Sequence, residues 1–338
     1  FAAWVNLGVA LYKASELPET ASAETTLADA ISALAHAHSL DPDHLAPLYY
    51  LGLSRLRLAL GGDPIYGRLD PRLAEQALDE HLRALAVAPK RFEVHSAIGE
   101  IHHLRGVTLS DLGDDPADAF EQAEAAYRRA SELAPEHPVP IINLAWTAYY
   151  RALTNVRTGR PPGAALRDSI ALAIRVRDSG RATAAFTCLG AAYTLDATWR
   201  LAEGRDPSDV LDEAREALAE ALRSNPRLIE GHRLAGRAES LAAENALRLG
   251  QDPEPALDRA AEHLDRAAER RPHAAPPQLG LAALALVRSR WHATQGRVAE
   301  ARSTAVEGLA ALDRARAAHP DHVEIGALAT ALTEAARR

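Results

Sequence analysis

Histidines, carboxylates and one thiol are the groups in this sequence that could do chemistry. His36, His38 and His44 lie close together, with acidic residues between them, at the end of one expected helix and in the turn after it. A metal site needs ligands that converge with a fixed geometry. A helix end followed by a turn does not impose such a geometry. We therefore interpret these histidines as solvated turn residues and expect no metal site.

Other reactive groups are better explained by structure. The adjacent His102 and His103 would diverge by about 100° on a helix and so could not readily share a metal ion. Cys188 lies in an apolar stretch without a nearby charge to lower its pKa, which favours a buried structural thiol. The neighbouring Asp114 and Asp115 fit a loop or a helix cap, and their spacing does not match a calcium-binding loop.

Sequence motifs of common enzymes are absent. The chain contains neither the Gly-x-x-x-x-Gly-Lys phosphate loop nor the Gly-x-Ser-x-Gly hydrolase elbow nor the His-Glu-x-x-His zinc helix. The signature motifs of protein kinases are also missing. We expect no catalytic residue and no cofactor in this segment.

Composition restricts the class of protein further. Hydrophobic residues make up 47% of the 338 residues, enough for a large core, and strong helix formers such as alanine, leucine and arginine dominate. The net charge is −8, and the basic residues form no stripe, so we expect protein or peptide partners and no nucleic acid. No apolar run reaches the roughly 18 residues of a membrane span, so we expect no membrane insertion.

Two further features concern location and completeness. A single cysteine excludes an internal disulfide and favours a reducing compartment, so we expect a cytoplasmic protein. The chain begins at Phe1, has no methionine and opens without a signal peptide, which indicates a segment of a longer protein.

An internal repeat organises the whole chain. Prolines end similar helical phrases at intervals of 45 to 48 residues, with one glycine in the series. These terminators are Pro42, Pro89, Pro135, Gly180, Pro226, Pro272 and Pro320. Proline cannot continue a helix interior, so each marks the turn into the next repeat.

Residues at two other positions recur at fixed distances from the terminators, and we call each such set a column. Ten residues after a terminator stands a small residue, which is Gly52, Gly99, Ala145, Gly190, Gly236 or Ala282, with Gly8 in the first repeat. Eight residues before a terminator stands Leu34, His81, Tyr127, Leu172, Leu218, Leu264 or Leu312. Small residues let neighbouring helices approach closely, and the bulky column fills the groove beside them.

The middle of each repeat carries a loop. Four loops contain Asp-Pro pairs, at Asp70, Asp115, Asp206 and Asp252, which could start a helix by capping its free amides, with proline at the first helical position. Gly113, Gly204 and Gly250 precede three of these pairs and could end the preceding helix. The pattern therefore predicts that each repeat consists of two helices joined by a capped loop.

The columns resemble a tetratricopeptide motif. Ala123, Tyr127, Ala130 and Pro135 resemble its second helix, and Leu51-Gly52 and Leu189-Gly190 resemble its first. The period is near 46 residues instead of the usual 34. The resemblance implies an all-α, right-handed superhelix of seven hairpins plus a C-terminal capping helix, forming one solenoid over residues 1–338. Its expected repeats span 1–43, 44–90, 91–136, 137–181, 182–227, 228–273 and 274–320, with the cap at 321–338.

The recurring Gly-x-Asp-Pro loop also resembles the long repeats that follow the kinase domain in some bacterial serine/threonine protein kinases. Three functional hypotheses result. The first is a scaffold that binds a peptide or protein partner in a concave groove. The second is the regulatory or sensory region of such a kinase, whose catalytic domain would lie outside this segment. The third is a regulatory solenoid that senses a small ligand.

The resemblance also implies which residues face the groove, because the first helix of each tetratricopeptide unit lines the concave surface. Positions three before, one after and four after the small-residue column give the candidates Tyr12, Tyr49, Glu100, His103, Ile142, Trp146, Tyr149, Arg233 and Arg237. Tyr, Trp and Arg are the residues that anchor protein interfaces. The alternative is that these aromatic side chains only pack between long helices.

Overall fold

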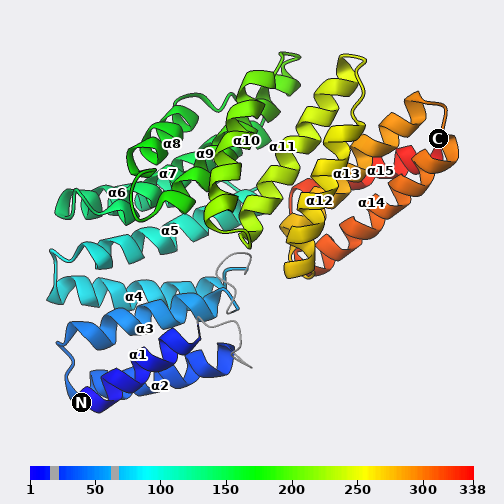
Figure 1. The fold of residues 1–338 in the computed structure, drawn as a ribbon. Helices are drawn as coiled ribbons and strands as arrows, with labels where there is room; N and C mark the ends of the chain where they lie inside the picture. Colours follow the sequence, from blue (N-terminus) through cyan, green and yellow to red (C-terminus); the bar gives the residue numbers. More distant parts are fainter. Residues whose placement is uncertain (16–22, 62–67) are drawn as a thin grey trace. The chain divides into compact units, whose positions relative to one another are not determined.

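The structure is a computed structural model that describes residues 1–15, 23–61 and 68–338 (Figure 1). Within these ranges every regular element is an α-helix, which confirms the all-α prediction. None of the described helices combines the length and the apolar character that crossing a bilayer requires. The chain forms two compact units. Unit 1 comprises Phe1–Ser110 and Asp114–Thr147, and unit 2 comprises Asp111–Gly113 and Ala148–Arg338.

Along the chain the helices alternate between the first and the second helix of successive hairpins (Figure 1). The first helices are α1 (Ala2–Ala14), α3 (Leu45–Ala59), α5 (Phe92–Leu112), α7 (Pro138–Arg157), α9 (Ala182–Ala202), α11 (Ile229–Arg248) and α13 (Ala275–Thr294). The second helices are α2 (Ala23–Leu40), α4 (Pro71–Val87), α6 (Ala117–Leu133), α8 (Gly163–Val176), α10 (Ser208–Ser224), α12 (Glu254–Arg270) and α14 (Val298–Ala318). A final helix, α15 (Glu324–Arg337), packs against α13 and α14.

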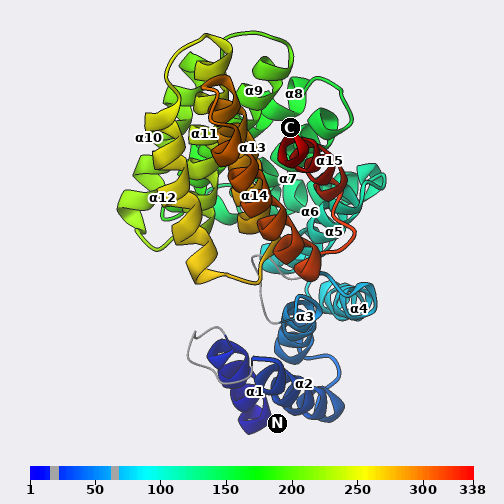
Figure 2. The ribbon, with the colours of Figure 1, turned by 90° about the vertical axis from the view of Figure 1, so that its right-hand side faces the viewer.

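Packing follows chain order within each unit. In unit 2, α9 packs on α10, α11 on α12 and α13 on α14, and each of α10 and α12 also contacts the next first helix. The first helices α9, α11 and α13 contact one another in series, so they form one layer and the second helices cover it (Figure 2). Unit 1 repeats the pattern with α1, α2, α3 and α4. The exact division into seven repeats and a cap stays a prediction.

The helix ends match the expected signals. Asp70 accepts hydrogen bonds from the amides of Arg72 and Leu73, at 2.8 and 3.1 Å. Asp115, Asp206 and Asp252 each accept the amide two residues further on, at 3.0 to 3.1 Å. Proline takes the first helical position at Pro71 alone among these four loops. In the other three it stands one residue before the helix, which corrects the prediction.

Glycines and prolines end the helices as expected. Gly113, Gly204 and Gly250 have φ angles of 82°, 71° and 68°, a left-handed conformation that glycine adopts without steric cost. At the other end of the hairpins, α4 and α6 stop two residues before Pro89 and Pro135. Proline pushes the residue before it out of the helical region, so the turn is encoded locally.

The bulky column packs directly on the small-residue column. Gly99 on α5 faces Tyr127 on α6, and a Cβ on that glycine would lie 2.8 Å from the tyrosine ring. The same close contact occurs at four further pairs, which are Gly8–Leu34, Gly52–His81, Gly190–Leu218 and Gly236–Leu264. These bulky side chains are at most 1% exposed, and each buried leucine contributes on the order of 2 kcal/mol to folding.

Candidate functional site

A hollow of about 290 Å³ lies in unit 1 between α3, α5 and the start of α7. Tyr49 lines it from α3, and Phe92, Glu93 and Glu100 line it from α5. His137, immediately before α7, completes the wall. Glu93 and Glu100 lie two helical turns apart, so both carboxylates belong to one stripe of α5. We call this hollow the acidic pocket.

Aromatic rings extend the pocket along α3 and α1. The Tyr49 ring lies 5.4 Å from the Tyr50 ring, and Tyr12 of α1 lies 5.9 Å from Tyr50. On the other side, Phe92 packs on His137 with ring centroids 4.5 Å apart. Edge-to-face and tilted pairs at these distances hold aromatic walls in place.

Burial controls the ionisation of the pocket. Desolvation, followed by the nearby Glu93, raises the pKa of Tyr49 far above its usual value, so the phenol stays protonated. Glu100 is an exposed residue, but the neighbouring helices partly remove water from its carboxyl group. Desolvation therefore raises the pKa of Glu100, while Arg57 opposes the rise. A cation that approached this carboxylate would restore the stabilisation that desolvation removes.

A hydrogen-bonded layer supports the pocket from behind. Desolvation and the nearby Glu100 raise the pKa of Tyr127, whereas its hydrogen bond with Asn143 lowers it. Thr147 donates its hydroxyl proton to the carbonyl oxygen of Asn143, at 2.9 Å. That hydroxyl therefore accepts a hydrogen bond from Nδ1 of His103, at 3.0 Å. Burial lowers the pKa of His103 to about 4, so the imidazole stays neutral near pH 7.

The structure separates the nine predicted groove residues. Tyr49 and Glu100 line the acidic pocket, Tyr12 stands beside it, and His103 belongs to the layer behind it. Within unit 1, Ile142 is 4% exposed and Trp146 is half-buried. In unit 2, Tyr149 is 8% exposed, Arg233 pairs with Glu230 at 2.5 Å, and Arg237 lies near the charge of Glu324. Their role in one partner-binding surface stays a prediction.

Phe92, Glu93, His137 and Asn143 are among the pocket residues that were not predicted from the sequence. A signal existed for Glu93, because it stands seven residues before Glu100 and therefore on the same helical stripe. The predicted groove positions begin three residues before the small-residue column, and Glu93 lies six before it. His137 lies in a turn and Asn143 two residues before the column, where helical periodicity gave no reason to select them.

The remaining reactive groups have structural partners. Cys188 is fully buried, its Sγ lies 3.6 Å from Oγ of Ser169, and desolvation raises the pKa of the thiol to about 12. His36 packs on the ring of Trp4, and Nδ1 of His44 accepts the amide of Ala46 at 3.2 Å. Among the described residues, no three His, Cys, Asp or Glu side chains are grouped so that they could hold a metal ion.

Comparison with known proteins places the fold. No protein-family profile matches the sequence, and no curated protein matches it. Among solved structures, the C-terminal part of a TPR repeat-containing protein from Cytophaga hutchinsonii matches 96% of this chain and 98% of its own, with 12% identity and a TM-score of 0.50. A monomeric IFIT1 mutant solved with m7Gppp-AAAA matches 90% of this chain and 59% of its own, with 16% identity and a TM-score of 0.50. Yeast Tom70 matches 98% of this chain and 63% of its own, with 15% identity and a TM-score of 0.48.

The fold is that of a tetratricopeptide-type helical solenoid. In this TPR-like solenoid the first helices supply the acidic pocket, while the second helices supply the bulky side chains that pack beneath the small residues. The chain spans about 60% of the IFIT1 and Tom70 chains that it matches. The likenesses to the Cytophaga hutchinsonii protein and to IFIT1 show the fold alone.

Proposed function

We propose that this chain is a protein-interaction scaffold that holds a lysine or arginine side chain of a partner peptide in the acidic pocket. The observation that carries the proposal is the pair of carboxylates, Glu93 and Glu100, set among the aromatic rings of Tyr49 and Phe92. The carboxylates attract the cationic head, and the rings contact the aliphatic stem and the cation itself.

The size and walls of the pocket favour a side chain over a free metabolite. A volume of about 290 Å³ is at the small end of ligand sites. Tyr12 and Tyr50 continue the aromatic surface beyond the pocket along the first helices. A peptide whose basic residue enters the pocket can lay its neighbouring residues on these rings. Such rigid aromatic anchors are typical of protein interfaces.

A peptide panel tests the proposal. Fluorescein-labelled nonapeptides with alanine backgrounds would carry Lys, Arg, Gln or Glu at the centre, and fluorescence anisotropy would measure their binding to the whole chain. We expect the Lys and Arg peptides to bind about tenfold tighter than the Gln peptide, a difference of about 1.4 kcal/mol. The Glu peptide should bind most weakly, because the pocket carboxylates repel it.

Two variants locate the effect. Glu100→Gln should remove most of the preference for Lys and Arg, whereas the matched Glu121→Gln, on an exposed position of α6, should keep it. Binding of the Lys peptide should also weaken as the pH falls through the raised pKa of Glu100, because the protonated carboxyl loses its charge. Equal affinity for the Lys and Gln peptides would overturn the proposal.

The other hypotheses remain separable. A kinase-regulatory role predicts kinase signature motifs elsewhere in the parent protein, which sequencing of the flanking gene would reveal. A short capped RNA, the kind of ligand in the IFIT1 structure, should not bind in the acidic pocket, because Glu93 and Glu100 repel phosphates. A metabolite sensor would show ligand-dependent melting in a thermal-shift screen. A cytoplasmic location is proposed from the single cysteine.

A further inference from the structure

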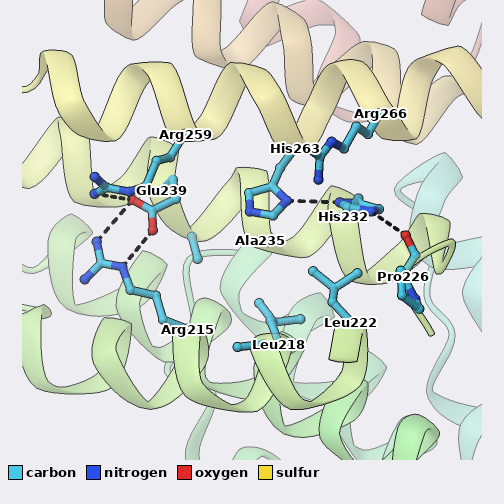
Figure 3. A pocket seen from close by; sticks show the side chains of 12 residues that line it. Arg215, Leu218, Leu222, Pro226, His232, Ala235, Glu239, Arg259, His263 and Arg266 are labelled. Atoms are coloured by element: carbon cyan, nitrogen blue, oxygen red, sulfur yellow. Dashed lines mark hydrogen bonds and ion pairs between the residues drawn. The ribbon is translucent and has the colours of Figure 1, made fainter. Parts of the chain in front are cut away.

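A larger hollow lies in unit 2, over α11 and between α10 and α12. Its volume of about 700 Å³ is in the range of small-molecule sites. Figure 3 shows Arg215, Leu218 and Leu222 along one side. Arg259, His263 and Arg266 line the opposite side, and His232, Ala235 and Glu239 of α11 lie between. We call it the arginine pocket.

The charges of the arginine pocket are arranged around one carboxylate. Glu239 is 6% exposed and accepts hydrogen bonds from both guanidinium groups that flank it. Arg215 donates through Nε at 2.8 Å and Nη2 at 3.2 Å, and Arg259 donates through Nη2 at 2.9 Å. Burial raises the pKa of Glu239, but these hydrogen bonds outweigh it and hold the pKa below its usual value. Two cations thus surround a single buried anion, and Arg266 adds a third cation to the lining.

The two histidines have distinct roles. Nε2 of His232 lies 3.1 Å from the carbonyl oxygen of Pro226, and the residue at the same repeat position, Gln278, donates its amide to the carbonyl of Pro272 at 3.2 Å. His232 therefore carries its proton on Nε2 and presents a lone pair at Nδ1. Nδ1 of His263 lies 3.0 Å from Nδ1 of His232, so it must donate its proton to that lone pair.

This pairing fixes the tautomer of His263. With its proton on Nδ1, neutral His263 has a lone pair at Nε2, and Figure 3 shows this second nitrogen on the side of the ring that faces Glu239 across the pocket. Protonation converts Nε2 into a donor and adds a positive charge there. His263 can therefore take up a proton when a negatively charged group enters the pocket.

The repeat shows that fold stability does not require His263. The residues nine before the terminators in the two neighbouring hairpins are Ala217 and Ala311, so the position accepts alanine. Glu239 has the neutral counterparts Tyr193 and Ala285, thirteen residues after their terminators. The repeated backbone supplies the geometry, but the charged lining occurs at this one place among these three hairpins.

We propose that the arginine pocket binds a small organic anion, with its carboxylate or phosphate near His263, Arg259 and Arg266 and its apolar body on Leu218, Leu222 and Ala235. Guanidinium groups suit both anions, because their planar N–H groups match paired oxygens. The buried leucine and alanine floor adds apolar contact area. This site is separate from the acidic pocket and does not depend on the proposed peptide binding.

The proton linkage gives the site a pH signature. Desolvation, with His232 and Arg266, lowers the pKa of His263, while Glu262 and Glu239 oppose this. A bound anion stabilises the protonated ring and raises that pKa. Binding then takes up a proton between the two pKa values, so the affinity must rise as the pH falls, by at most about tenfold per pH unit. Asp212 and Glu262 are exposed acceptors that pair with Arg215 and Arg266.

The test uses the whole chain and four small probes, which are benzoate, phenyl phosphate, inorganic phosphate and neutral benzamide. Isothermal titration calorimetry and NMR of the histidine Cε1–H signals would follow binding at pH 6 and pH 8. We expect benzoate or phenyl phosphate to saturate the site at pH 6 and to bind at least about fivefold more weakly at pH 8. Whichever of the two binds tighter identifies a carboxylate or a phosphate site.

His263→Ala should abolish the pH dependence and weaken binding, while the exposed His273→Ala should change neither. Arg266→Gln is a second variant and should weaken both aromatic anions without altering the circular dichroism spectrum. Glu100→Gln, in the acidic pocket, should leave anion binding unchanged. The peptide proposal and the anion proposal can therefore fail independently of each other. The proposal is overturned if neither aromatic anion saturates, if benzamide or inorganic phosphate binds as tightly, or if His263→Ala binds like the parent chain.

Discussion

The acidic pocket of unit 1 and the arginine pocket of unit 2 are made from the same repeat but carry opposite charge. The acidic pocket lies on first helices, where Glu93 and Glu100 share a stripe of α5. The arginine pocket lies against the second helices α10 and α12, with Arg215 and Arg259 around Glu239. The periodic core supports both hollows, and substitutions at a few non-core positions decide what each can bind.

The cores beneath the two pockets differ in one respect. In unit 2 the bulky column contributes Leu218 and Leu264 to the packing on Gly190 and Gly236. In unit 1 Leu34 packs on Gly8 in the same way, but the contacts beneath the acidic pocket use His81 on Gly52 and Tyr127 on Gly99. Unit 1 therefore places polar atoms in a position that the fold fills with hydrocarbon elsewhere. This difference in chemistry should be visible in the stability of the two units.

The largest expected effect concerns a charged contact inside unit 2. Arg157, near the end of α7, pairs with Asp111 at 2.8 Å and with Glu324, at the start of α15, at 2.8 Å. The side chain of Arg157 is 16% exposed. Val323 adds a backbone bond by donating its amide to the carbonyl of Asp111, at 2.8 Å. These contacts tie residues far apart in the sequence into one unit.

Arg157→Met should destabilise unit 2 by about 2–3 kcal/mol, because two partly buried carboxylates lose their shared cation. Urea unfolding followed by circular dichroism would measure it, with Arg129→Met as the control, since Arg129 pairs with Glu132 at an exposed site. An unchanged midpoint in Arg157→Met would show that the contact contributes nothing to unit 2.

An effect of opposite sign, smaller at pH 7, is expected in unit 1. His81 is fully buried, and neither of its ring nitrogens has a hydrogen-bond partner among the described residues. Burial lowers its pKa to about 4, below the unfolded value near 6.5. The unfolded chain therefore binds more protons between these values, so stability is lost as the pH falls through this range.

His81→Leu should stabilise unit 1 by about 1–2 kcal/mol at pH 7, because leucine removes the two unsatisfied nitrogens and fits a glycine contact, as Leu218 does. At pH 5 the gain should grow by about 2 kcal/mol, from 1.36 kcal/mol per pKa unit. Urea unfolding at both pH values measures the difference, and His95→Leu, at a partly exposed site, provides the control. A gain in stability that did not grow at low pH would show that burial does not lower the pKa of His81.

The fold could be predicted well from the sequence because its signals are local and repeated. Asp70 and Gly113 determine helix ends through their own backbone neighbours, and the Gly99–Tyr127 contact follows from a column that recurs along the chain. The pockets were harder to predict because they combine residues from three helices at positions where the repeat varies. His137 lines the acidic pocket from a turn, and no periodicity predicts the side chains of a turn.

The arginine pocket shows the same limit more sharply. The repeat pattern predicted that Arg233 faces a groove, which stays a prediction, and in the structure Arg233 pairs with Glu230. The pattern gave no weight to His263, which stands where the hairpins on either side have alanine. Such a departure would select His263 from the sequence by itself.

Trp146→Ala is expected to have the smallest effect on stability and a clear effect on binding. Trp146 lies half-buried on α7 in unit 1, one position after the small-residue column, which places it among the predicted groove residues. If it contacts the partner, the variant should lose peptide affinity about tenfold or more, as truncated aromatic anchors do. Helicity should change little, because the side chain keeps solvent contact.

The peptide panel and circular dichroism measure both quantities on one sample, and Trp291→Ala in unit 2 is the matched control. Unfolding of Trp146→Ala, with the control intact, would show that this ring is part of the core and that the groove lies elsewhere on the first helices.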